Sequence, residues 1–80
     1  MRIGEAVRLR ILGLCAERGI SVNRLATISG VTQSTLNNIV SGRNESATVS
    51  TVKKLCDGLD ISITEFFSAP EFDGLEQEVR

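Results

Sequence analysis

The chain has 80 residues, enough for one domain with a modest hydrophobic core and too few for an elaborate catalytic domain. Apolar residues make up 41% of it and its net charge is −1, ordinary values for a globular protein, and no apolar run approaches the ~20 residues of a membrane span. The opening residues MRIGEAVRLR lack the apolar core of a signal peptide, so we expect a cytoplasmic protein.

Charge is distributed unevenly along the chain. A net charge of −1 is unfavourable for a protein that binds nucleic acid. Residues 1–70, however, hold eight Arg or Lys and six acidic residues, whereas residues 71–80 hold four acidic residues and one Arg. We therefore expect a mildly basic globule with a net charge of +2, followed by an acidic tail with a net charge of −3.

Residue types that carry catalysis or bind metals are scarce. The chain has no histidine, and Cys15 and Cys56 lie 41 positions apart, so we predict no metal site and no cofactor. We interpret both cysteines as small buried hydrophobic residues, although the sequence leaves a disulfide between them open. There is no clustered carboxylate pair, no glycine-rich phosphate loop and no base beside a hydroxyl, which argues against an enzyme.

The first predicted helix runs from Gly4 or Glu5 to about Arg18. Gly19 is a natural stop for it, because glycine takes up the left-handed conformation that ends many helices. Apolar residues at helical spacing form its expected core stripe: Ile3, Val7, Ile11 and Leu14.

Residues 21–40, SVNRLATISGVTQSTLNNIV, form the centre of the chain and predict two short helices joined by a tight turn. Ser21 and Thr32 are good N-caps for helices over about 22–29 and 33–40, and Gly30 can end the first helix at positive φ. The first helix has a short apolar face of Leu25, Ala26 and Ile28, and the second is expected to turn Leu36, Ile39 and Val40 inward. A link of only three residues forces a sharp crossing, as in a helix-turn-helix.

The outer face of the second helix is polar but uncharged: Gln33, Ser34, Asn37 and Asn38. A face that serves only solvation would more often carry Glu and Lys, which are better helix formers than Ser and Asn. Gln and Asn side chains can bind adenine through two hydrogen bonds, and Ser can bond to several bases. Residue type alone leaves a plain solvated face and a base-reading face about equally plausible.

Two further helices follow. Thr48 is the expected N-cap of the first, Asp60 breaks its pattern, and a capping box over Ser62 and Glu65 starts a short helix that Pro70 ends. The apolar residues of the two helices are Val49, Val52, Leu55, Cys56, Leu59, Ile63, Phe66 and Phe67. We expect at least one of the two phenylalanines to close the core, while the other is available for a dimer contact.

The acidic tail, residues 70–80, places Phe72, Leu75 and Val79 on one face of a possible helix that Gly74 weakens. Three outcomes are open: the tail packs on its own globule, joins a dimer, or frays as chain termini do. Competition between the tail and DNA for the basic surface is a fourth option with less support.

The central motif resembles the lambda-repressor-like and Cro-like helix-turn-helix family, also called XRE-type regulators. The residues that carry the resemblance are Leu25, Ala26, Gly30, Val31, Gln33, Ser34, Leu36 and Ile39. The resemblance extends from about residue 3 to residue 67. It implies an all-α, five-helix lambda-repressor-like domain over residues 1–69, with the helix-turn-helix motif at 21–41.

The resemblance also implies a sequence-specific DNA-binding transcriptional regulator, commonly a repressor, that acts as a homodimer on double-stranded DNA and needs no evident small-molecule ligand. The second helix of the motif would enter the major groove of a palindromic operator. The expected base contacts are Gln33 and Ser34, followed by Asn37 and Asn38. The expected phosphate contacts are Ser21, Asn23, Thr32, Arg43 and Asn44, which position the protein without reading sequence.

Four positions depart from the pattern of the family. Val22 replaces a glutamine that often touches phosphate, and Asn23 substitutes for it only partly. Cys15 and Val40 replace an Arg–Glu ion pair, which we interpret as a hydrophobic contact in its place. Glu45 lies in a loop where relatives often place cations, so we expect modest DNA affinity per subunit.

The alternative hypothesis is a protein-interaction module on the same fold, with weak or lost DNA binding. The near-neutral charge, Glu45 and the acidic tail favour it. A steep salt dependence of DNA binding would argue against it, because each phosphate that a cation neutralises releases a counterion.

Overall fold

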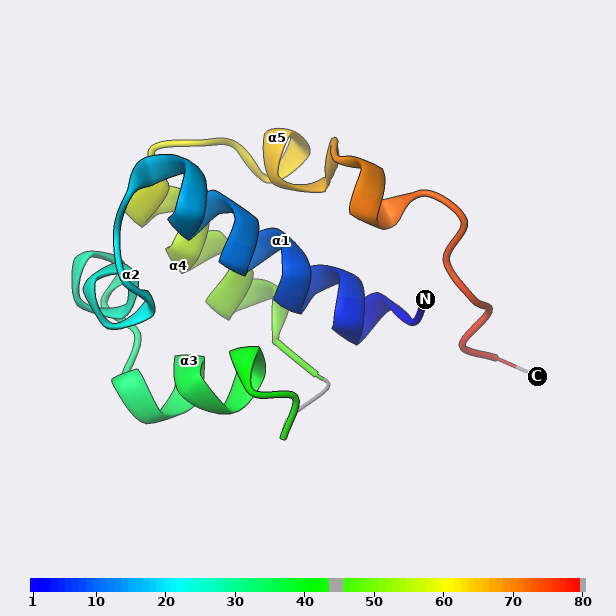
Figure 1. Cartoon of the computed structure of the whole chain (residues 1–80), viewed down its shortest axis with the longest axis horizontal. Coiled ribbons are helices and arrows are strands. Elements are labelled where there is room, and N and C mark those ends of the chain that lie inside the picture. The colour runs from blue at the N-terminus through cyan, green and yellow to red at the C-terminus, as the bar shows by residue number, and fades with distance from the viewer. Residues whose placement is uncertain (44–45, 80) are drawn as a thin grey trace.

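A computed structural model describes residues 1–43 and 46–79. Over these residues the chain is helical and contains no strand, which confirms the predicted all-α class. The elements are α1 (Ile3–Arg18), α2 (Val22–Ser29), α3 (Gln33–Val40), α4 (Val49–Leu59), α5 (Ile63–Phe67) and a 3₁₀ helix, η1 (Pro70–Phe72). Figure 1 shows α1 and α4 at the centre, with α3 and α5 on opposite sides of them. None of these helices is long and apolar enough to cross a membrane.

Local capping fixes the bounds of α2 and α3 where the sequence predicted them. The hydroxyls of Ser21 and Thr32 each accept a hydrogen bond from the backbone N–H three residues further on. Gly30 has φ 68°, a conformation that glycine takes without steric cost. The N–H of Val31 then donates to the carbonyl of Ala26 at 3.1 Å, which closes α2. The turn between α2 and α3 is therefore encoded within this short stretch.

The first helix begins slightly earlier than its sequence predicted. α1 starts at Ile3, directly after Arg2, which is extended and provides no side-chain cap. The helix ends at Arg18, as predicted, because Gly19 takes a left-handed conformation with φ 65°. The earlier start places the side chain of Arg2 beside the first turn of the helix, a position that matters for the C-terminal segment described below.

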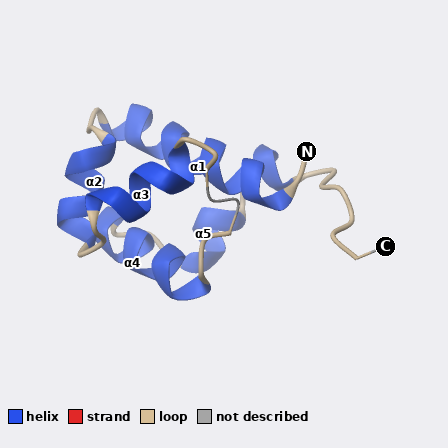
Figure 2. Ribbon diagram, turned by 90° about the horizontal axis from the view of Figure 1, so that it is seen from below, coloured by secondary structure: helices blue, strands red, loops and turns tan. Residues whose placement is uncertain are grey.

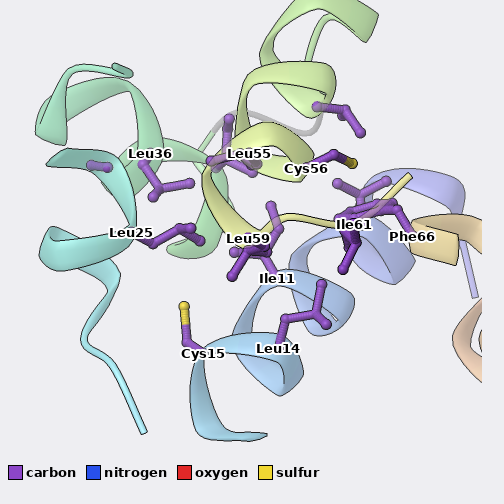
Figure 3. Packing of buried hydrophobic residues seen from close by; sticks show 14 residues of the cluster. Ile11, Leu14, Cys15, Leu25, Leu36, Leu55, Cys56, Leu59, Ile61 and Phe66 are labelled. Atoms are coloured by element: carbon purple, nitrogen blue, oxygen red, sulfur yellow. The ribbon is translucent and has the colours of Figure 1, made fainter. Parts of the chain in front are cut away.

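All five α-helices contribute to one hydrophobic core (Figure 3). Its buried residues are Val7, Ile11, Leu14, Cys15, Leu25, Ala26, Leu36, Ile39, Val52, Leu55, Cys56, Leu59, Ile61 and Phe66. Val40 packs partly buried against this cluster, as does Ile3. Of the short apolar face predicted for α2, Leu25 and Ala26 are buried, whereas Ile28 is 39% exposed. In a helix of eight residues the core-facing stripe is narrow, and Leu25 and Ala26 already fill it.

Cys15 and Cys56 are free thiols, so the open possibility of a disulfide between them is not realised. Both are buried and belong to the hydrophobic core, as the interpretation of small buried residues predicted. Burial raises the pKa of each thiol, because desolvation disfavours the thiolate. Among the described residues no group of three or more His, Cys, Asp or Glu side chains is placed to hold a metal ion.

The caps of α4 and α5 are formed by the predicted residues. The hydroxyls of Thr48 and Ser62 each accept a hydrogen bond from the N–H three residues on. α4 ends at Leu59, because Asp60 takes a left-handed conformation with φ 56°. The predicted stop is wrong in detail. α5 already ends at Phe67, and Pro70 begins η1 instead. Proline suits the first position of a helix, because the backbone N–H that it lacks would have no partner within the helix there.

The acidic tail does not form the α-helix that its apolar spacing left possible after Pro70. The 3₁₀ helix η1 packs along α1, and residues 75–79 then run past the start of the chain (Figure 1). The backbone N–H of Glu76 donates to the carbonyl of Met1 at 3.0 Å, which fixes this path. Gly74, with φ 68°, turns the chain out of a helical course. Of the three open outcomes, the tail packs on its own globule.

Candidate nucleic-acid interface

The third helix forms an open face of the molecule. Figure 2, turned toward this side, shows α3 across the front with no other helix covering it. Its inner face is held by Leu36 and Ile39, which are buried in the core. Burying two large aliphatic side chains stabilises the docked helix by roughly 3–6 kcal/mol. The orientation of α3 is therefore fixed by the core, and its outer face is left for a partner.

All four predicted base-contact residues lie on this outer face. The side chains of Gln33, Ser34, Asn37 and Asn38 are exposed. The three amide groups make no hydrogen bond to any other described residue. An amide presents both donors and an acceptor, the combination that pairs with the N6 and N7 atoms of adenine. The Ser34 hydroxyl lies 3.5 Å from the Thr32 hydroxyl, so the structure brings together three uncommitted amide groups and one weakly engaged hydroxyl on one rigid helix.

The helix caps differ in what they leave for a phosphate. The Ser21 hydroxyl accepts from the N–H of Arg24 at 3.0 Å, so its own hydrogen remains available to donate. The Thr32 hydroxyl accepts from the N–H of Thr35 and also donates to the Thr35 hydroxyl at 2.7 Å. Its hydrogen is therefore engaged within the cap. Ser21 is the better placed of these two predicted phosphate contacts.

The other predicted phosphate contacts differ in whether the structure describes them. Asn23 and Arg43 are exposed, and neither side chain is engaged by another described residue. Asn44 lies outside the described residues, as does Glu45. Val22, which occupies the position of the family glutamine, packs partly buried against the core and offers no polar group. The groups at the start of α2 that are able to donate to a phosphate are its free backbone N–H groups and the Ser21 hydroxyl.

Arg24 is a candidate that the sequence prediction missed. It lies in the first turn of α2, is exposed and pairs with no acidic side chain among the described residues. A cation near a helix N-terminus is unfavourable for the helix dipole, which prefers negative charge there. The signal was thus present in the sequence: a basic residue placed where it opposes helix stability suggests a role outside the helix.

A hollow of about 450 Å³ lies beside the C-terminal end of α3. The start of α1 provides one wall with Arg2 and Arg8, and the end of α3 provides the other with Ser41 and Gly42. The hollow brings Arg2, which precedes α1, and Arg8 of α1 to the edge of the face that α3 presents. Arg43 follows Gly42 directly in the chain. Glu5 also lines the hollow and pairs with Arg8 at 4.0 Å, which offsets part of this positive charge.

A small all-helical domain with a helix-turn-helix and an uncovered polar second helix belongs to the class of DNA-binding regulators. The particular family follows from comparison with known proteins. Residues 10–71 match the family model of the Cro/C1-type helix-turn-helix DNA-binding domain, and the chain belongs to this family. It is therefore a DNA-binding regulatory protein, as the resemblance of its central motif indicated.

A solved structure supports the same assignment. The crystal structure of the prophage Lp1 protein 11 is 34% identical to this chain and superposes with a TM-score of 0.80. The match covers 94% of this chain and 100% of that chain. The curated proteins contain no match. The likeness confirms the lambda-repressor-like fold of the chain.

Proposed function

We propose that the chain is a sequence-specific transcriptional repressor that reads its operator with α3 in the major groove. The observation that carries this proposal is the outer face of α3, where four exposed polar side chains project from a helix that the core anchors. Gln33 and Ser34 lie at the N-terminal end of α3, the part of a recognition helix that contacts base edges. Asn37 and Asn38 extend the face by one turn.

We assign phosphate contacts to the two flanks of α3. On one side Ser21, Asn23 and Arg24 surround the start of α2, and on the other side Arg43 follows the end of α3. Asn44 stays a predicted phosphate contact. Such contacts fix the register of the protein on DNA, while the groups on α3 supply the specificity.

We also propose that the chain binds a palindromic operator as a homodimer. An apolar groove of about 270 Å³ lies beside α4 and α5 and is lined by Ile3, Val7, Ala47, Val49, Val52, Ile63 and Phe67. Val49 is 79% exposed at its rim, and Phe67 is 39% exposed. Protruding apolar side chains beside a matching groove favour a two-fold contact in which each copy covers the groove of the other.

The test of operator reading is selection of bound duplexes from a random DNA pool, first at low and then at moderate salt. We expect a palindromic consensus for the natural chain. Replacing Gln33 and Ser34 together by alanine should weaken binding to that consensus by at least about tenfold, because a good base contact provides about 1–3 kcal/mol of discrimination.

The matched control replaces the same residue types outside the interface, as Gln77→Ala with Ser68→Ala. Both side chains are exposed and lie C-terminal to α5. Operator affinity should then stay within about twofold, since surface substitutions away from special features rarely exceed ±0.5 kcal/mol. Recovery of no consensus, or equal losses in the two double variants, would contradict operator reading and favour a protein-interaction module on the same fold.

A further inference from the structure

The C-terminal segment is fastened to the globule by an aromatic cluster. Phe72 of η1 lies with its ring centre 4.8 Å from that of Phe67 and 6.0 Å from that of Phe66. These contacts position η1 next to α1 and direct the following residues toward the start of the chain (Figure 1). The path of residues 75–79 is thus set by packing at one end and by polar contacts at the other.

Two acidic side chains of this segment lie on cations at the start of the chain. A carboxylate oxygen of Glu78 is 3.1 Å from the guanidinium of Arg2. Glu76 pairs with the amino group of Met1 at 3.3 Å and, through its backbone N–H, binds the Met1 carbonyl. All of these side chains are substantially exposed, and exposed ion pairs are weak. Another anion can therefore displace the carboxylates.

The cation that Glu78 neutralises lies at the edge of the DNA-binding face. Arg2 lines the hollow whose opposite wall contains Ser41 and Gly42, at the end of α3. Arg43 follows immediately. A phosphate group bound at this edge would lie within the Debye length of Arg2, about 8–10 Å at physiological salt, where the charge still attracts it.

We propose that residues 75–79 form an autoinhibitory strap, in which Glu76 and Glu78 occupy the cations at the start of the chain and compete with DNA phosphates for them. This inference rests on the proposed DNA-binding function. Since the ion pairs are weak, the strap lowers DNA affinity without abolishing it, and DNA binding releases it. A strap of this kind also explains why a DNA-binding domain carries acidic residues next to its own arginines.

The test uses the full chain and a double-stranded DNA of random sequence, because a phosphate contact requires no particular sequence. The variant Glu76→Gln with Glu78→Gln removes the competing charges. Binding should become roughly three- to tenfold tighter at low salt. The plot of log affinity against log salt should steepen by about 0.9 for each cation that gains a phosphate.

The matched control is Glu71→Gln with Asp73→Asn. It changes the net charge by the same amount in the same segment, but these carboxylates form no ion pair among the described residues. We expect a gain of less than about twofold and an unchanged salt slope. Equal gains in the two variants would reduce the effect to overall charge and overturn the strap. Circular dichroism before and after heating checks that both variants fold.

A second measurement follows the strap directly. In the free protein the backbone N–H groups of residues 75–79 should show NMR order parameters near those of the helices, and in the DNA complex these should fall below about 0.6. Order parameters near those of the helices in the complex would contradict the release of residues 75–79 by DNA. If neither the natural chain nor any variant binds DNA, the proposed function itself fails. If the natural chain binds DNA and the Glu76 and Glu78 variant gains nothing, only the strap fails.

Discussion

At the scale of single residues, Gly58 marks a very close approach between two helices. A Cβ atom at this position of α4 would lie 2.2 Å from the Ser29 hydroxyl oxygen and 3.1 Å from the Ser29 Cα. The Ser29 hydroxyl is buried and has no hydrogen-bond partner among the described residues. Glycine is required here because α2, the first helix of the DNA-binding motif, rests directly on the backbone of α4.

The replacement Gly58→Ala should lower the free energy of unfolding by about 1–3 kcal/mol, because the added methyl group forces α2 and α4 apart. Gly13→Ala is the matched control. Its nearest neighbour would be a Glu71 oxygen at 3.8 Å, so the change should raise stability by about 0.5–1 kcal/mol through helix propensity. Urea-induced unfolding measures both. Equal effects at the two positions would contradict a steric role for Gly58.

Burial was predicted correctly for residues whose spacing places them on one face of a helix. Leu36 and Ile39 are buried because their spacing matches the helical repeat. Ile28 lies on the same short helix as Leu25 and is nevertheless exposed. Hydrophobicity does not reveal which of several apolar residues meets a neighbour, since this depends on how α2 crosses α1 and α4.

At the scale of elements, Arg10 holds the short helix α5 against α1. Its Nε donates to the Phe66 carbonyl at 2.8 Å, and a terminal nitrogen donates to the Glu65 carbonyl at 3.0 Å. The guanidinium carbon also lies 5.9 Å from the centre of the Phe66 ring. A helix of five residues has little stability of its own, so these contacts at its C-terminal end fix its position.

The replacement Arg10→Met keeps an apolar stem and removes the donors, so it should lower stability by about 1–2 kcal/mol. Backbone amides of α5 and η1 should exchange hydrogen faster, while those of α2 and α3 change less. Arg18→Met provides the comparison, because Arg18 is exposed and pairs with no described side chain. Uniformly faster hydrogen exchange over all helices, or unchanged exchange in α5, would contradict the role of Arg10 in holding α5 against α1.

The elements that the sequence predicted correctly are those whose ends are set by cap and turn residues close by in the chain. Ser21, Gly30 and Thr32 determine α2 and α3 through contacts within a few residues, so their bounds could be read directly. The course of the C-terminal segment was left open between three outcomes, because it depends on partners at the other end of the chain, such as Met1 and Arg2. Helical periodicity contains no information about such contacts. For the same reason the residues on the outer face of α3 could be predicted from the sequence. The hollow beside α3 could not, because it lies between α3 and the start of the chain.

At the scale of the whole molecule, the proposed dimer predicts that one exposed valine matters and another does not. Val49→Glu places a charge at the rim of the apolar groove and should weaken self-association at least about tenfold, since an unpaired charge is costly to bury in an interface. Val79→Glu makes the same change at a valine of similar exposure, 77%, outside the groove.

Analytical ultracentrifugation over a range of concentrations measures both variants. The Val79 variant should associate like the natural chain. Operator affinity should fall with self-association in the Val49 variant, because a monomer contacts only one half-site. Unchanged association of the Val49 variant would exclude the groove as the dimer contact, and a monomeric natural chain would exclude the dimer.

The division of α3 into two faces has a consequence for how such proteins diversify. Leu36 and Ile39 are buried in the core and Val40 packs against it, while the four polar side chains on the opposite face are exposed. Substitutions of exposed residues on that face should change stability little, so under the proposed function a lineage is able to change its operator and keep its fold. Selection for a new target site and selection for a stable fold then act on different residues, which lets one scaffold serve many regulators.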